Sequence, residues 1–164
     1  MIRAVLVDTS YLIALVNDAD PLHEDAKRYY KYFLQHSIPM YLSVIVIAEF
    51  HQKQSAIDLL GSEKYITLPY NVTEALASAD MGHALGSGAR VGNRAEFKDD
   101  VKLLAQAKNE NLEFLITADA ATLHKYCEKL RQAGMINTQS ICLTDGYDEA
   151  WFNPQRQKAL GLEP

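Results

Sequence analysis

Short apolar runs alternate with amphipathic stretches along most of the chain. The first run, residues 4–7, is continuously apolar, and it is followed by Asp8, Thr9 and Ser10, which all favour the N-cap of a helix. Comparable runs predict strands at residues 39–42, 65–68, 114–116 and 141–143. Because strands that alternate with helices form parallel sheets covered on both faces, the pattern predicts an α/β fold, a three-layer sandwich with a mostly parallel central sheet.

Cap residues and helix breakers place helices between these strands. One stretch is ambiguous, because residues 44–47 have strand-like propensity and only the apolar spacing that continues through residues 48–60 favours a helix. The expected helices cover residues 11–16, 21 to at least 33, 44–60, 74–85, 96–109 and 120–132, with Asp20, Ser43, Thr73 and Asp119 as N-caps.

The composition is that of a single globular domain. The chain has 164 residues, of which 48% are hydrophobic and 23% charged, so it can bury a sizeable core and is unlike a disordered or disulfide-built chain. We expect one domain over residues 1–143. The extension, residues 144–164, holds Tyr147, Trp151 and Phe152, which are costly to leave in water, so we expect it to pack on its own domain or at a dimer interface.

Three features bear on the compartment. Cys127 and Cys142 have no CxxC spacing and are too few to staple a domain of this size, which favours a reducing compartment. The longest apolar run, residues 44–48, is far shorter than the roughly 18 residues of a membrane span. Asp8 interrupts the apolar start of the chain and no Ala-x-Ala cleavage site follows, so we expect a cytoplasmic protein without a cleaved leader or membrane contact.

Two aspartates stand at the ends of predicted strands. Asp8 directly follows the first strand, and Asp119 nearly follows the strand at residues 114–116. In open parallel sheets the functional crevice lies at the carboxyl ends of the strands, so both side chains are candidates for a site. The alternative for either one alone is a helix N-cap, which is a common use of aspartate.

Two further carboxylates lie on predicted helices. Glu49 follows the apolar residues 44–47, which places it at the margin of the core, where an uncompensated charge is costly; an exposed helix face is the alternative. Asp99 and Asp100 are adjacent in the helix expected over residues 96–109. At helical spacing Asp99 lies on the same face as polar residues, whereas Asp100 lies on the apolar face with Leu103, Leu104 and Ala107. Asp100 is therefore expected to point inward, although both aspartates also suit the first turn of a helix.

Together the four carboxylates predict a divalent-metal site at one edge of the sheet. Converging like charges repel unless a cation neutralises them, and oxygen-only ligation suits Mg²⁺ or Mn²⁺ rather than zinc. We expect the side chains of Asp8, Glu49, Asp100 and Asp119 to converge on such a cation. Glu96, one turn before Asp100, is a candidate for the outer shell.

A net charge of −5 means that attraction to a polyanion needs bound cations or a local basic patch. Arg90 and Arg94 lie in a glycine-rich loop that is expected to be mobile, and Lys98 follows in the Asp100 helix. The three side chains can form such a patch for phosphate groups. The alternative is a solvated loop with scattered charge.

These motifs occur in a fixed order along residues 2–143. They are residues 5–10 (Val-Leu-Val-Asp-Thr-Ser), Ser43 with Glu49, Asp100 with Leu103, Leu104 and Ala105, and residues 117–119 (Thr-Ala-Asp). In this order and spacing the sequence resembles the PIN-domain nucleases. The resemblance implies that Asp8, Glu49, Asp100 and Asp119 form the metal-binding acidic set, and that the Thr9 and Thr117 hydroxyls support it.

The resemblance also implies an activity and partners. PIN-domain proteins are typically Mg²⁺- or Mn²⁺-dependent endoribonucleases that act on single-stranded RNA. Many are VapC-type toxins, which are neutralised by an antitoxin protein and assemble as homodimers. The chain is accordingly expected to be such an endoribonuclease, which hydrolyses phosphodiester bonds with the help of bound metal. In this scheme Asp8 and Asp100 make the main metal contacts and Asp119 completes or orients the shell. Glu49 either binds the metal through water or helps to position the attacking water.

Two other functions are possible for a chain with these residues. The first is an inactive PIN-like module that binds RNA or a protein without cutting, although a pure binder of polyanions gains nothing from clustered carboxylates. The second is a small-molecule phosphatase with Asp8 as nucleophile, but the required second aspartate is absent, since Ser10 occupies its position. The chain also lacks a Walker loop and a GxGxxG motif, so nucleotide-dependent classes are not supported.

Overall fold

The computed structural model describes residues 2–86 and 94–152, and its centre is a five-stranded sheet. All strand pairings are parallel, with Leu6 opposite both Tyr41 and Leu115. The order is β3-β2-β1-β4-β5, formed by β1 (Ile2–Val7), β2 (Met40–Ser43), β3 (Tyr65–Leu68), β4 (Leu112–Thr117) and β5 (Gln139–Cys142). The predicted α/β fold with a parallel sheet is confirmed.

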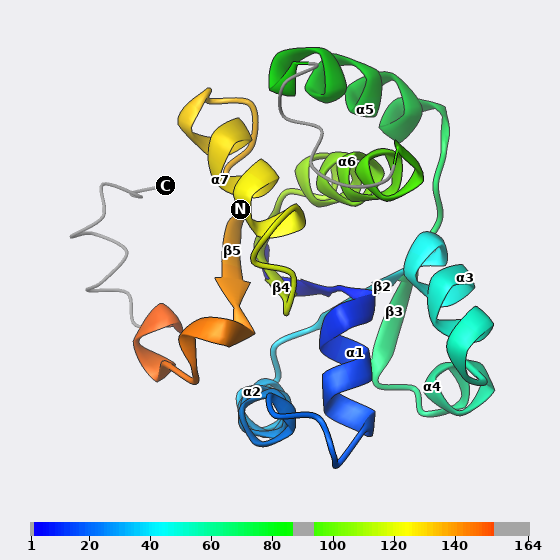
Figure 1. The fold of residues 1–164 in the computed structure, drawn as a ribbon, viewed down its shortest axis with the longest axis vertical. Helices are drawn as coiled ribbons and strands as arrows, with labels where there is room; N and C mark the ends of the chain where they lie inside the picture. The colour runs from blue at the N-terminus through cyan, green and yellow to red at the C-terminus, as the bar shows by residue number, and fades with distance from the viewer. Residues whose placement is uncertain (1, 87–93, 153–164) are drawn as a thin grey trace.

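Helices lie on both sides of this sheet. Figure 1 shows α1 and α2 on one side and α5 and α6 on the other, with α3 and α4 beside the β3 edge. The helices are α1 (Thr9–Val16), α2 (His23–Gln35), α3 (Val44–Lys53), α4 (Ile57–Gly61), α5 (Val72–Leu85), α6 (Arg94–Asn109) and α7 (Leu123–Gln132), followed by the 3₁₀ turns η2 (Leu143–Asp145) and η3 (Glu149–Phe152). Within the described ranges, no helix has the length and apolar character needed to cross a bilayer.

The two central strands explain the continuous apolar runs of the sequence. Residues 4–7 of β1 are completely buried, and all six residues of β4 are buried, because helices cover both faces of the sheet there. The edge strand β3 is partly exposed, with Ile66 retaining 48% of its accessible surface. The polar residues that follow β1 and β4 therefore emerge side by side from the centre of the core.

Five predicted helix starts are wrong. Helices α1 and α6 each begin two residues earlier than expected, at Thr9 and Arg94. Helix α2 begins at His23 rather than Pro21, because Asp20 accepts a hydrogen bond from Leu22 N–H (2.8 Å) and caps a turn before the helix. Helix α5 begins at Val72 instead of Glu74, and the Glu74 carboxylate accepts the N–H of Asn71 (2.9 Å) at the cap. Helix α7 begins only at Leu123, since Asp119 likewise caps a turn instead of the helix.

The helix predicted over residues 44–60 is broken in two. Ser43 caps α3 as predicted, its hydroxyl accepting Ile45 N–H at 3.0 Å. Gln54 is extended, however, and Ala56 is buried, with its N–H donating to His51 Nδ1 (3.1 Å). Burial of Ala56 thus ends α3 and starts the separate helix α4.

The aromatic residues after β5 pack on α2. Phe152 is 3% exposed, its ring stacks on Tyr32 and meets the edges of Phe33 and Phe114, and its carbonyl oxygen accepts a hydrogen bond from Arg3. The Tyr29 hydroxyl donates to the Gly146 carbonyl (3.2 Å) and accepts the Asp148 N–H (3.1 Å). Residues 144–152 therefore complete the outer surface of this domain.

Two predicted features fall outside the described residues. The glycine-rich loop, with Arg90, lies almost wholly in residues 87–93, and the end of the extension lies in residues 153–164.

Replacing Phe152 with alanine should lower the free energy of unfolding by about 3 kcal/mol, because it removes a fully packed ring. Urea denaturation followed by circular dichroism measures this change. Ile57→Ala is the control, since Ile57 is 68% exposed and the loss in free energy of unfolding should stay within about 0.5 kcal/mol. Equal losses in the two variants would contradict the packing described for residues 144–152.

Candidate active site

Five acidic residues line one pocket at the carboxyl ends of the central strands. The pocket has a volume of about 550 Å³. Asp8 follows β1, Asp119 follows β4, Glu49 comes from α3, and Glu96 and Asp100 come from α6. The structure therefore brings together the four acidic residues predicted from the sequence, together with Glu96.

Hydroxyl groups fix the orientation of Asp8. The Thr117 hydroxyl donates to Asp8 Oδ2 at 2.8 Å, and the Ser10 hydroxyl and N–H donate to the same oxygen. Ser10 in turn accepts the N–H of Ala118 at 2.8 Å. Among the described residues all these donors converge on Oδ2, so the second oxygen, Oδ1, stays available for a ligand.

Glu49 is held from the neighbouring helix. The Thr9 hydroxyl donates to Glu49 Oε2 at 2.5 Å, which links α1 to α3. Burial raises the pKa of Glu49; the Thr9 hydrogen bond opposes this effect, and the nearby negative charges of Asp8 and Asp99 add to it. Glu49 is thus a carboxylate poised to accept a proton or a cation.

Asp100 carries the largest electrostatic cost in the pocket. Its Oδ2 is buried and has no hydrogen-bond partner among the described residues. Burial raises the pKa of Asp100 to about 8, with further increases from Asp8, Asp119 and Glu49 and an opposing contribution from the Thr122 hydroxyl. The neighbouring Asp99 instead pairs with Lys102 at 2.7 Å, so the helix has the phase expected from its apolar stripe.

Asp119 is the most strongly hydrogen-bonded carboxylate of the set. Its Oδ1 accepts the N–H groups of Ala121 (2.8 Å) and Thr122 (2.9 Å), and its Oδ2 accepts the Thr122 hydroxyl. Burial opposes ionisation, but these hydrogen bonds outweigh it and lower the pKa of Asp119. Asp119 therefore contributes a fixed negative charge to the pocket while it also holds the turn before α7.

The chemistry of this pocket fits a hard divalent cation. The side chains that could bind a metal in this pocket are carboxylates, with no His or Cys among the described residues that line it. Asp100 Oδ2, which has no hydrogen-bond partner among the described residues, requires either a proton or a nearby positive charge. Within the described residues, however, no three Asp, Glu, His or Cys side chains are arranged to hold an ion as they stand. The carboxylates surround the pocket, and a cation would have to draw them together.

The predicted basic patch is not part of this pocket. Arg94 and Lys98 are exposed on α6 and do not line it, and Arg90 lies outside the described residues. Two pocket residues were not predicted from the sequence: Ser10, which was expected only as a cap, and Lys53. The signal for Lys53 was its spacing, since it lies one helical turn after Glu49.

The chain is similar to known proteins in its fold, as seen in solved structures, and not in its sequence. No protein-family model and no curated protein sequence matches the chain. Among solved structures, FitAcB from Neisseria gonorrhoeae superimposes with a TM-score of 0.60 at 15% identity, covering 85% of this chain and 98% of its own. VapBC-1 from nontypeable Haemophilus influenzae gives 0.56 at 20% identity, with coverages of 86% and 98%.

A third similar structure is that of a toxin with a known cleavage target. Mycobacterium tuberculosis VapC20, described as a toxin that cleaves the sarcin-ricin loop, superimposes with a TM-score of 0.55 at 19% identity over 83% of this chain and 99% of its own. At such identities these likenesses establish the fold alone. The PIN-type fold implied by the sequence resemblance is confirmed.

Asp100→Asn should stabilise the metal-free protein increasingly as the pH rises. The unfolded Asp100 loses its proton near pH 4, whereas the folded one keeps it to about pH 8, so the stability it contributes is full below pH 4 and is lost between pH 4 and pH 8. Asparagine does not titrate, so the variant escapes this loss, which is on the order of a few kcal/mol.

Melting temperatures measured in EDTA from pH 4 to pH 8 test this prediction. The difference between Asp100→Asn and the wild type should grow with pH across that range. Asp99→Asn controls for net charge, because it removes an aspartate that is paired with Lys102. A difference that stays constant with pH would contradict the buried position of Asp100.

Proposed function

We propose that this chain, which has the PIN-type fold of the VapC proteins, is a Mg²⁺- or Mn²⁺-dependent endoribonuclease that hydrolyses phosphodiester bonds in single-stranded RNA. The observation that carries the proposal is the acidic pocket in which Asp8, Glu49, Asp100 and Asp119 meet, with a buried Asp100 oxygen that lacks a partner among the described residues. A pocket with this charge repels RNA unless cations fill it, so it suits metal-assisted phosphate chemistry better than simple binding of a polyanion.

Asp8, Asp100 and Asp119 are the residues proposed to hold the metal. A cation held by these three carboxylates would offset their charges and would supply Lewis-acid polarisation of the phosphodiester. Thr117 and Ser10 keep Asp8 Oδ2 engaged, which directs Oδ1 to the ligand. Glu49, oriented by Thr9, is proposed to position the attacking water and accept its proton. Glu96 is proposed to act in the outer shell.

We also propose an antitoxin partner and a homodimer. VapBC2 from Rickettsia felis, another structure of this fold (TM-score 0.57, 14% identity, covering 84% of this chain and 98% of its own), was solved as VapBC bound to a promoter DNA fragment, which supports a partner of the VapB type. The exposed apolar side chains of Ile66, Val72 and Leu76 support a protein contact near β3 and α5. Two buried free thiols, Cys127 and Cys142, support a cytoplasmic location.

The purified protein should cleave labelled single-stranded RNA in the presence of Mn²⁺ and stop when EDTA is added. Asp100→Asn is expected to lower the cleavage rate about 100-fold, because it removes a proposed metal ligand, whereas Asp99→Asn should change the rate little. Gel electrophoresis of the products measures both rates. Equal losses would contradict the assignment of Asp100, and RNA binding without cleavage by the wild type would favour the inactive binding module.

The basic residues at the start of α6 should contribute to RNA affinity. Arg94→Ala/Lys98→Ala is expected to weaken binding and to reduce the slope of log K against log salt by about 1.4, since each contact with a single strand contributes about 0.7. Fluorescence anisotropy at several salt concentrations measures the slope. Lys27→Ala/Lys31→Ala on α2, which Figure 1 places away from α6, is the control with the same change in charge. An equal change of slope in the control would contradict a local RNA contact.

A further inference from the structure

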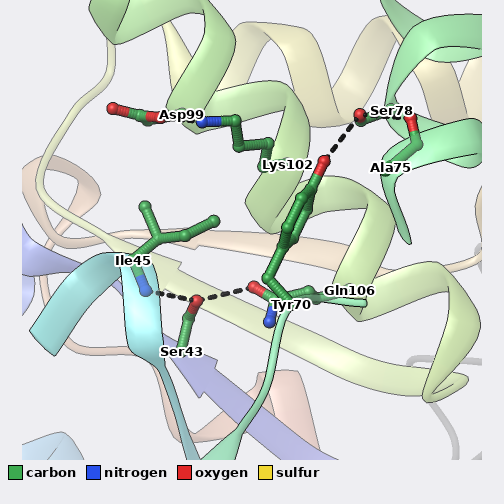
Figure 2. A network of polar contacts seen from close by, with 8 residues as sticks. All are labelled: Ser43, Ile45, Tyr70, Ala75, Ser78, Asp99, Lys102 and Gln106. Carbon is green, nitrogen blue, oxygen red and sulfur yellow. Dashed lines mark hydrogen bonds and ion pairs between the residues drawn. The ribbon is translucent and has the colours of Figure 1, made fainter. Parts of the chain in front are cut away.

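One buried hydrogen bond joins the segment that carries Glu49 to the helix that carries Asp100. The Ser43 hydroxyl, fully buried at the end of β2, donates to Gln106 Oε1 at 2.6 Å (Figure 2). Ser43 also caps α3 through Ile45 N–H. Gln106, 1% exposed on α6, donates from Nε2 to the carbonyl oxygen of Pro69 at 2.8 Å and, more weakly, to that of Leu68 at 3.4 Å.

The two helices joined in this way pack on different neighbours. Helix α3 packs against α1 and β2, while α6 packs against α5, α7 and β4. Glu49 lies six residues after Ser43, and Asp100 lies six residues before Gln106, so each carboxylate is about 9 Å along its helix from the hydrogen bond. The hydrogen bond therefore ties the start of α3 to the C-terminal part of α6, and each helix leads from there to its carboxylate in the pocket.

The energetics of the pair point to a role in geometry. A buried hydrogen bond contributes little net stability compared with an apolar pair of the same shape, and leaving either partner unmatched is costly. The Gln106 side chain accepts a hydrogen bond from Ser43 and at the same time donates to carbonyl oxygens at the C-terminal end of β3. These hydrogen bonds can all form only when α6 has one particular position relative to β2 and β3. A sliding or tilting α6 would break at least one of these bonds.

We infer that Gln106 is a positioning residue, which through Ser43 sets the separation of Glu49 from Asp100 across the pocket. The inference rests on the proposed function for its catalytic consequence. Gln106 contacts neither substrate nor metal in this scheme, and it acts only by fixing α6 against the start of α3.

Gln106→Met and Ser43→Ala test this role from the two ends of the bond. Each should weaken Mn²⁺ binding about 10-fold, measured by calorimetry, and lower kcat with little change in KM for RNA. The double variant should lose less than the sum of the two single effects, because both changes remove the Ser43–Gln106 hydrogen bond in addition to the contacts that each residue makes alone. Ser43→Ala also keeps the test valid if Gln106→Met fails to fold.

Tyr70→Phe is the matched control. It removes the hydrogen bond between Tyr70 and Ser78 (3.0 Å), which lies in the same region (Figure 2) but links the loop after β3 to α5. It should lower the melting temperature while Mn²⁺ affinity and kcat stay at wild-type values. A loss in this control as large as that in Gln106→Met would overturn the inference, as would full Mn²⁺ affinity in Gln106→Met.

A distance measurement separates this inference from the proposed function. Spin labels at the exposed positions Ala48 on α3 and Lys98 on α6 report the separation of the two helices without metal or RNA, since Cys127 and Cys142 are buried. The distance distribution should be narrow in the otherwise unchanged protein and broad with Gln106→Met. If the wild type neither binds Mn²⁺ nor cleaves RNA, the proposed function fails, and an unchanged distribution in the variant would overturn the inference independently.

Discussion

The parallel pairing of β1 with β4 is the constraint on which the rest of the site depends. The Asp8 N–H donates to the Ile116 carbonyl at 3.1 Å, so the ladder continues one residue past β1 and places Asp8 beside Thr117. The hydrogen bonds from the Thr117 hydroxyl to Asp8 and from the Ala118 N–H to Ser10 follow from that register. A slip of one residue would turn Asp8 to the opposite face of the sheet and dismantle the pocket.

The pocket concentrates negative charge that the fold only partly compensates. Asp119 is stabilised by the donors of its own turn, whereas Asp100 is buried with an oxygen that lacks a partner among the described residues. A protein selected for stability alone would not retain Asp100 in this state, because a neutral side chain of similar shape avoids the cost. A buried carboxylate that costs stability distinguishes a candidate site from the capping aspartates elsewhere in the chain, which are stabilised by their own hydrogen bonds.

Most of the fold could be predicted because strands and helix caps depend on residues that are adjacent in the sequence. The features that could not be predicted depend on contacts between residues far apart in the sequence. Buried strands and the caps at Asp8 and Ser43 depend on adjacent residues, so the sequence predicted them. The break after α3 depends on where Ala56 is buried, and the role of Gln106 depends on carbonyl groups 37 and 38 residues away; neither is visible in a helical pattern. Of the site, the four carboxylates could be predicted, whereas the hydroxyls of Ser10 and Thr122 required the three-dimensional arrangement.

The packing of Phe152 has a consequence for how the chain matures during synthesis. All the carboxylates of the pocket lie within residues 8–119, yet α2 and the start of β1 remain uncovered until Phe152 reaches Tyr32 and Arg3. A nascent chain that has emerged only to β5 would contain every acidic residue of the pocket while still exposing an aromatic surface on α2. Translation through Phe152 thus couples the appearance of the acidic pocket to coverage of α2, so that a chain terminated before Phe152 exposes a surface that chaperones and proteases recognise.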